Sequence, residues 1–239
     1  MKKIIFTLLA LVGTMSMNAQ VIEVYKGNVL VAKYKSSQAD NVVFKEEEPL
    51  GKTGKAYAKA PNCDVNWVQL WKDGPKFAEY NVGATSKTGY GGLYNWGMSN
   101  PQSSSNASIY QSGTFVLSGN DDTATNLWGS NWRMPTKEEF EALLNNQNCT
   151  CTWTTQNGVK GLLCKGKENT DYSSNSVFLP AAGYCIDGRV FGQGDLGYYW
   201  SSTPDGSNNA YYLDFLSGSQ YVHNGRRNCG FSVRAVLNE

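Results

Sequence analysis

Short runs in which apolar and polar residues alternate dominate this chain, and most of them are bounded by Gly, Asn, Ser or Pro. Alternation with a period of two is typical of half-buried β-strands, and the bounding residues favour turns. The pattern therefore predicts short antiparallel strands and few helices. The predicted strands lie within residues 21–45, 67–71, 77–82, 150–165 and 176–179, and within the C-terminal stretch 197–236.

A single helix is clearly indicated, directly after residue 136. Thr136 and Glu139 have the spacing of a capping box, in which each side chain binds a backbone N–H at the start of the helix. Phe140, Leu143 and Leu144 then recur at helical spacing and give the helix one apolar face. Residues 99–126, by contrast, are rich in Ser, Asn and Gly, and we expect a long surface excursion there.

The segment 149–165 predicts a β-hairpin and a disulfide. Asn157-Gly158 is a two-residue turn signal between two strand-like runs. With that loop Gln156 faces Val159, and counting outward places Cys151 opposite Cys164. The Cα atoms of such a non-hydrogen-bonded pair lie about 4.5 Å apart, which is close enough for a disulfide. A bulged turn would shift the register and prevent the bridge.

The N-terminus has the features of a secretory signal peptide over residues 1–19. Lys2 and Lys3 precede an apolar run, and Met17-Asn18-Ala19 supplies small residues for cleavage. Residues 20–48 predict a short β-hairpin module around Gly27-Asn28, with a third short strand over 41–44. Residues 49–61 lack periodicity and predict a linker. The main domain is expected over 62–239.

Charge and cysteine content support an exported, binding-type protein. Without Lys2 and Lys3 the chain has 19 basic residues against 20 acidic ones, so nothing favours nucleic-acid or membrane-surface binding. No segment has the roughly 20 apolar residues of a transmembrane helix, so no membrane insertion is expected. Six cysteines in an oxidising compartment favour disulfides. A metal site at Cys149 and Cys151 is the alternative, with His223 as the only available imidazole.

Six short phrases occur in a characteristic order along the chain. They are FAEYNVGA at 77–84, YNWG at 94–97, WRMPT at 132–136, LPAAGY at 179–184, YWSS at 199–202 and GFSVR at 230–234. In this order they resemble the Fibrobacter succinogenes major paralogous domain family of exported bacterial proteins, over roughly residues 65–237. The resemblance implies an α+β, C-type-lectin-like fold with few helices and short antiparallel strands, here preceded by the small β-hairpin module.

Two activities of similar folds can be tested against these residues. Calcium-dependent lectins bind the ion with a Glu-Pro-Asn or Gln-Pro-Asp loop that is followed by a Trp-Asn-Asp strand. This chain has neither, and its nearest phrase, Thr203-Pro204-Asp205, lacks the paired carboxylate and amide ligands. Formylglycine-generating enzymes carry a reactive cysteine after an arginine near the C-terminus, where this chain has Arg234-Ala235. We therefore expect no catalytic residues, no metal and no cofactor; an enzyme of the formylglycine-generating type is the least favoured alternative.

The stretch 197–236 is rich in Tyr, Ser, Asn, Asp, Gly and Arg, a composition typical of recognition surfaces. We expect it to bind a protein or glycan ligand outside the cytoplasm, in the periplasm, at the cell surface or in the medium. Tyr212, Asp214 and Leu216 alternate along one strand and so share a face. The predicted binding residues are Tyr198, Tyr212, Asp214, Leu216, Ser219, Tyr221, His223, Asn224 and Arg226.

The same stretch resembles the variable tails of diversity-generating-retroelement proteins, whose mutated Asn codons never yield Lys, Glu, Gln, Met or Trp. Residues 203–236 contain none of these except Gln220. The scarcity of Lys and Glu starts earlier, however, so composition fits both a diversified and an ordinary tail. Trp96, Trp128, Trp132 and Trp200 could form an exposed sugar-binding platform, but a core position is favoured. His223 is expected in a solvated surface loop.

Overall fold

A computed structural model describes residues 21–26, 29–35, 55–60 and 63–238, with side chains from residue 65 onward. The chain divides into two compact units, Met1–Glu47 and Glu48–Glu239. In the first unit β1 (Val21–Lys26) pairs antiparallel with β2 (Val29–Lys35), with a bulge after Val24. The predicted strand over 41–44 and the predicted signal peptide lie outside the described residues.

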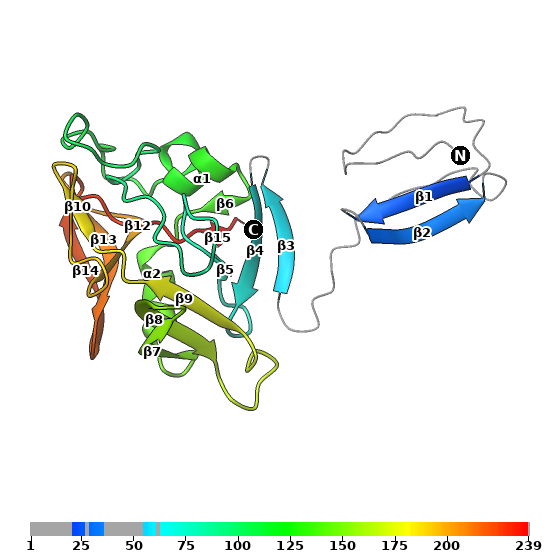
Figure 1. The fold of residues 1–239 in the computed structure, drawn as a ribbon. Coiled ribbons are helices and arrows are strands. Elements are labelled where there is room, and N and C mark those ends of the chain that lie inside the picture. Colours follow the sequence, from blue (N-terminus) through cyan, green and yellow to red (C-terminus); the bar gives the residue numbers. More distant parts are fainter. Residues whose placement is uncertain (1–20, 27–28, 36–54, 61–62, 239) are drawn as a thin grey trace. The chain divides into compact units, whose positions relative to one another are not determined.

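The second unit is built mainly from short antiparallel strands (Figure 1). Its largest sheet has the order β3-β4-β5-β15-β6. Its strands are β3 (Lys55–Ala60), β4 (Cys63–Gln69), β5 (Lys76–Ala78), β15 (Val236–Leu237) and β6 (Trp132–Arg133). The C-terminal strand lies between β5 and β6, because Val236 pairs with both Phe77 and Arg133. Both ends of the domain therefore meet in one sheet.

The predicted linker over 49–61 differs from the structure at its C-terminal part. Lys55–Ala60 forms strand β3, which pairs with β4 from Lys55↔Val68 to Ala60↔Cys63. The segment KAYAKA is too short and too rich in Ala and Lys to give a strand signal of its own. Its partner strand supplies the hydrogen bonds that fix it in the sheet.

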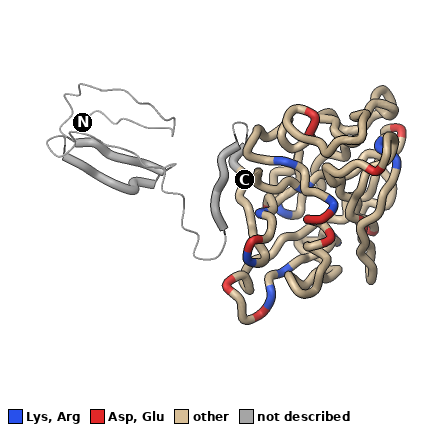
Figure 2. The backbone as a smooth tube through the Cα atoms, turned by 180° about the vertical axis from the view of Figure 1, so that it is seen from behind, with Lys and Arg blue, Asp and Glu red and all other residues tan. Residues whose placement is uncertain are grey.

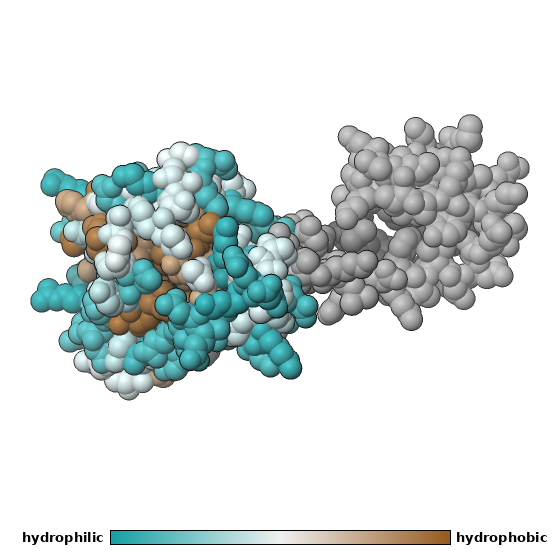
Figure 3. Space-filling view, turned by 90° about the horizontal axis from the view of Figure 1, so that it is seen from below, coloured by the Kyte–Doolittle hydropathy of each residue, from teal (hydrophilic) through white to brown (hydrophobic). Residues whose placement is uncertain are grey.

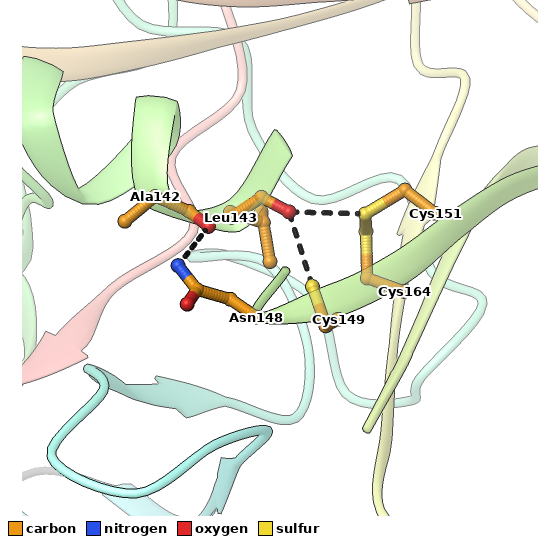
Figure 4. Close-up of a disulfide and its surroundings, with 6 residues drawn as sticks. All are labelled: Ala142, Leu143, Asn148, Cys149, Cys151 and Cys164. Atoms are coloured by element: carbon orange, nitrogen blue, oxygen red, sulfur yellow. Dashed lines mark hydrogen bonds between the residues drawn. A yellow bond between two sulfur atoms is a disulfide. The ribbon is translucent and has the colours of Figure 1, made fainter. Parts of the chain in front are cut away.

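The predicted hairpin and disulfide are confirmed. β7 (Cys149–Gln156) and β8 (Val159–Gly166) pair with Cys151 opposite Cys164, and β9 (Ser176–Pro180) adds a third strand. Asn157 and Gly158 have positive φ values of 49° and 80°, as a two-residue hairpin turn requires. The bridged Cα atoms lie 4.0 Å apart (Figure 4). Because Cys151 is in a disulfide, it is no metal ligand.

A third sheet is formed by β12 (Gly197–Asp205), β13 (Asn209–Leu216) and β14 (Ser219–Arg226). A small hairpin, β10 (Tyr184–Ile186) and β11 (Arg189–Phe191), adjoins it. The hairpin is held by backbone bridges from Gly183 to Gly197 and from Cys185 to Gly230. The first residue of β12 and the segment after β14 therefore anchor the hairpin beside the sheet.

Helix α2 (Lys137–Leu144) has the predicted capping box, and Asn145 ends it. A second helix, α1 (Thr123–Trp128), overlaps the end of the stretch 99–126 that was predicted as a surface excursion, so that prediction is wrong for its last residues. The buried carboxylate of Asp122 starts α1: it accepts hydrogen bonds from Ala124 and Thr125, and also from Met134 at 2.8 Å. Burial raises the pKa of Asp122 to about 6, against the lowering effect of these N–H donors.

The tryptophans belong to the core. Trp96, Trp132 and Trp200 are fully buried, and Trp128 nearly so. The indole N–H of Trp96 donates to the Ser201 carbonyl, and that of Trp200 donates to the Tyr94 carbonyl, both at 2.8 Å. The alternative of an exposed Trp platform is therefore wrong for these residues, because none of their rings is free to stack on a sugar.

The arginine of the GFSVR phrase is a core polar group. Arg234 is fully buried and donates two hydrogen bonds to Asn81 Oδ1, at 2.8 and 3.0 Å. It also donates to the carbonyls of Ala78 and Phe178. Burial lowers the pKa of Arg234 to about 10, although the guanidinium stays charged at neutral pH. One side chain thus joins β5, β9 and the C-terminal segment.

Candidate ligand-binding face

The three-stranded sheet β12-β13-β14 has one face turned toward the core. Leu213 and Phe215 of β13 are buried in a cluster that also contains Tyr199 of β12, and Val222 of β14 packs against that cluster. Tyr199 stacks on Phe215 with ring centroids 5.7 Å apart. Since side chains alternate along a strand, the residues between these lie on the opposite side of the sheet.

That opposite side carries most of the predicted binding residues. Asp214 is paired with Tyr198 on one neighbouring strand and with Tyr221 on the other, while Tyr212 is paired with His223. Directly opposed residues share a face. The aromatic face, as we call it, is the side of this sheet that carries Tyr198, Tyr212, Asp214, Leu216, Ser219, Tyr221 and His223.

Two of the predicted residues point elsewhere. Asn224 is paired with Tyr211, and Arg226 with Asn209, so both alternate with the residues of the aromatic face and lie on the other side of β14. The expectation that His223 lies in a loop is also wrong, because it sits within β14. Polar residues of an edge strand look like a turn in sequence, and only the pairing with β13 distinguishes the two.

Aromatic rings form a continuous row along the aromatic face. Phe191 stacks on Tyr184 at 5.5 Å, and Tyr184 meets Tyr198 edge-on at 5.3 Å. The row continues from Tyr198 to Tyr212 at 5.7 Å and from Tyr212 to His223 at 6.5 Å. It ends where His223 and Tyr221 stack in nearly parallel planes at 5.4 Å. All of these separations lie within the range of favourable ring contacts.

The two ends of this row are open to solvent, whereas its middle is held by the core. Phe191 is 45% exposed and Tyr221 is 54% exposed. Between them, Tyr212 packs edge-on against Phe231 at 4.9 Å, and Phe231 in turn packs against the buried Trp200 at 4.3 Å. The rings are thus fixed from beneath and present edges and faces outward.

Tyr184 and Phe191 were not predicted as part of this surface, since they come from the β10–β11 hairpin. A signal for that hairpin exists in the sequence, because Asp187-Gly188 is a two-residue turn motif between alternating residues. Asp187 and Gly188 have φ values of 50° and 76°, as this turn requires. Sequence alone does not place the hairpin next to β12.

Asp214 is the one carboxylate of the aromatic face as defined above. Its side chain is only 17% exposed, and its Oδ1 lies 3.1 Å from Nδ1 of His223. Burial raises the pKa of Asp214, and a protonated His223 would act in the opposite direction. Burial, followed by the nearby carboxylate, also raises the pKa of Tyr198, and raises that of Tyr212 to about 12. Both tyrosines therefore stay neutral hydrogen-bonding groups at physiological pH.

Among the described residues, the aromatic face does not combine a nucleophile with a base in the way that hydrolytic enzymes do. Within residues 65–238 no Ser hydroxyl or Cys thiol is hydrogen-bonded to His223, so the His223–Asp214 pair has no nucleophile to activate. Cys229 lies near the face as a free thiol, and burial raises its pKa, which makes it less reactive. The described residues also contain no cluster of three His, Cys, Asp or Glu side chains placed to hold a metal ion.

Elsewhere among the described residues, segments with Lys or Arg and segments with Asp or Glu lie next to each other in several places (Figure 2). Hydrophobic side chains reach the surface between hydrophilic ones (Figure 3). A depression of about 430 Å³ lies between the loop at residues 83–94 and the β10–β11 hairpin, and Tyr94, Gln102, Cys185 and Val190 are among its lining residues.

Of three comparisons with known proteins, only the one with protein-family models gave a match for this chain. Searches of curated proteins and of solved structures gave no match. No helix among the described residues has both the length and the apolar character needed to cross a membrane. The model of the Lcl C-terminal domain matches residues 76–237, which include all of the aromatic face. The chain therefore belongs to the Lcl C-terminal domain family.

Proposed function

We propose that this protein is an exported, non-enzymatic recognition module that binds a protein or glycan ligand through the aromatic face. The observation that carries the proposal is the row of rings from Phe191 to Tyr221, which is exposed at both ends and fixed from beneath. Rigid aromatic side chains lose little conformational entropy on binding and commonly dominate the energy of an interface.

The frame of this module is proposed to be C-type-lectin-like, and export is proposed to depend on the signal-like residues 1–19. Short antiparallel strands with few helices agree with the first proposal, and the disulfide agrees with the second. A fold of this kind does not by itself define a ligand, so the assignment of function rests on the aromatic face alone.

A matched pair of variants on one strand tests the binding role. Tyr221→Ala with His223→Ala removes the exposed end of the ring row. Asn224→Ala with Arg226→Ala changes the same strand on its other side. The immobilised mature protein is exposed to a glycan array and to a panel of purified extracellular proteins. We expect specific capture by the wild type and by the Asn224/Arg226 variant, and a loss of about tenfold or more in the Tyr221/His223 variant.

Equal loss in both variants, or unchanged capture in the Tyr221/His223 variant, would contradict the assignment to the aromatic face. Circular dichroism of each variant confirms that the fold is intact before binding is compared. The absence of capture by the wild-type protein from both collections would count against a recognition role outside the cytoplasm.

Diversification of the tail is a second proposal, and the alternation of the aromatic face favours it. Tyr212, Asp214 and Leu216, which alternate on one side of β13, all carry residues that adenine-specific mutagenesis of Asn codons can produce. Coding DNA from sister isolates tests it. Substitutions confined to aromatic-face codons would support diversification, and scattered or silent changes would refute it.

A further inference from the structure

The carboxylate of Asp214 is poorly satisfied within its own protein. Its Oδ1 is buried but makes no hydrogen bond of good geometry, although Nδ1 of His223 lies 3.1 Å away. Buried polar atoms without a partner cost stability and are rare in native proteins. Oδ1 itself is covered and faces His223, so an approaching ligand would meet the part of the Asp214 side chain that remains exposed, 17% of it.

Aromatic rings surround this carboxylate on the aromatic face. Tyr198 lies directly opposite on β12 and Tyr221 directly opposite on β14, while Tyr212 lies two residues away on the same strand. His223 stacks on Tyr221 and completes the enclosure. The faces of aromatic rings attract cations, and a carboxylate beside them adds a negative charge that can pair with the same cation.

No Lys or Arg of the described residues occupies this enclosure. The groups that face Asp214 are Tyr198, Tyr212, Tyr221 and His223, with the Cys229 thiol near the first two. Arg226 lies on the other side of β14. Arg227 is fully buried, and its guanidinium donates to the carbonyls of Asn209, Gln111 and Gly206. Among the side chains that the structure describes, from residue 65 onward, only His223 lies within ion-pair distance of the Asp214 carboxylate.

We infer that the Asp214 enclosure on the aromatic face binds a cationic side chain, lysine or arginine, presented by a protein partner. This inference rests on the proposed function, because it names the chemistry of the ligand that the aromatic face binds. Asp214 supplies the charge and the rings of Tyr198, Tyr212 and Tyr221 supply the cation–π contacts. His223 lies beside this site, with its Nδ1 3.1 Å from Asp214 Oδ1.

Small cations test the enclosure without knowledge of the partner. The isotopically labelled mature protein is titrated with n-butylammonium and with methylguanidinium, and with n-butanol as the neutral analogue, while backbone amide resonances of residues 212–223 are followed. We expect saturable shifts with the cations at about millimolar concentration and none with n-butanol. The stronger of the two cations identifies the side chain as lysine or arginine.

Variants then assign the interaction to Asp214. Asp214→Asn should weaken cation binding about tenfold or more, whereas Arg226→Ala on the other side of the strand should leave it unchanged. Equal shifts with n-butanol, or undiminished binding by Asp214→Asn, would overturn the inference.

Ligand binding by the aromatic face and cation binding at Asp214 can be tested independently. If the Tyr221/His223 variant loses a captured ligand but Asp214→Asn keeps it, the aromatic face still binds and only the cationic chemistry is wrong. If the cations bind at Asp214 but no ligand is captured by the aromatic face, the enclosure is real and the proposed recognition role is the part that fails.

Discussion

His223 Nδ1 lies 3.1 Å from Asp214 Oδ1, although the two residues belong to different cross-strand pairs. Asp214 is paired with Tyr221, and His223 with Tyr212, so the contact runs diagonally across β13 and β14. A diagonal contact of this kind depends on the exact register of the hairpin, because a slip of one residue would move His223 to the other side of the sheet.

The ionised carboxylate of Asp214 should lower the stability of the folded protein at neutral pH. Asp214→Asn should raise the free energy of unfolding at about pH 7, by less than about 1 kcal/mol because solvent screens a partly exposed group. The sign follows from the pKa, which burial raises in the folded protein. A raised pKa means that the Asp214 carboxyl group holds its proton more tightly in the folded state than in the unfolded state. Ionised Asp214 therefore destabilises the folded state increasingly as the pH rises above the pKa of a free aspartate.

Urea unfolding of both proteins at about pH 4 and about pH 7 checks this prediction. The advantage of Asp214→Asn should be larger at the higher pH. Asp195→Asn is the control, since Asp195 is exposed and pairs with Lys160 only at the surface. A wild-type protein that is more stable than Asp214→Asn at both pH values would show that His223 fully compensates the burial.

Loss of the buried arginine should destabilise the domain severely. Arg234→Met leaves the Asn81 side chain and the carbonyls of Ala78 and Phe178 buried without their donor. We expect a loss of about 3–5 kcal/mol in the free energy of unfolding. Arg226→Met, on an exposed strand position, should change it by no more than about 0.5 kcal/mol. Similar midpoints in urea for the two variants would contradict the structural role of Arg234.

The disulfide should contribute measurably to stability. Its residues are separated by 13 positions, and closing a loop of this size is worth about 3 kcal/mol in the chain-entropy model. Cys151→Ala with Cys164→Ala should therefore lower the free energy of unfolding by about 2–3 kcal/mol. Cys229→Ser removes a thiol outside the bridge and serves as the control. An effect of the double variant no larger than that of Cys229→Ser would refute the prediction.

The stability of the domain should depend on the carboxylate of Asp122, the N-cap of α1, and should fall when one of its oxygens is replaced by an NH₂ group. In Asp122→Asn the amide oxygen can still accept from Ala124 and Thr125, but the new NH₂ group would face the N–H of Met134, which now donates to Oδ2. Two donors cannot pair, so we expect a loss of about 1–3 kcal/mol. Thermal unfolding measures it, and Asp121→Asn, one residue earlier, is the matched control. Equal melting temperatures would show that Met134 finds another acceptor.

The hairpin at 149–165 and the helix at 137–144 could be predicted from sequence because their determinants are local. The Asn157-Gly158 turn fixes the pairing of its own strands, and Thr136 and Glu139 cap the helix that directly follows them. The strand β3 and the helix α1 gave no such signal. Each depends on partners outside its own segment: β4 for the first, and the contact from Met134 to Asp122 for the second.

For the aromatic face, the sequence determined which residue types are present and that Tyr212, Asp214 and Leu216 share a side of one strand. Tertiary structure decided which neighbours join them. It placed Tyr184 and Phe191 beside the sheet, buried the tryptophans, and turned Asn224 and Arg226 away. The physical reason is that a strand fixes only the alternation of its own side chains. The register and neighbours of that strand depend on long-range hydrogen bonds and packing, which no local pattern specifies.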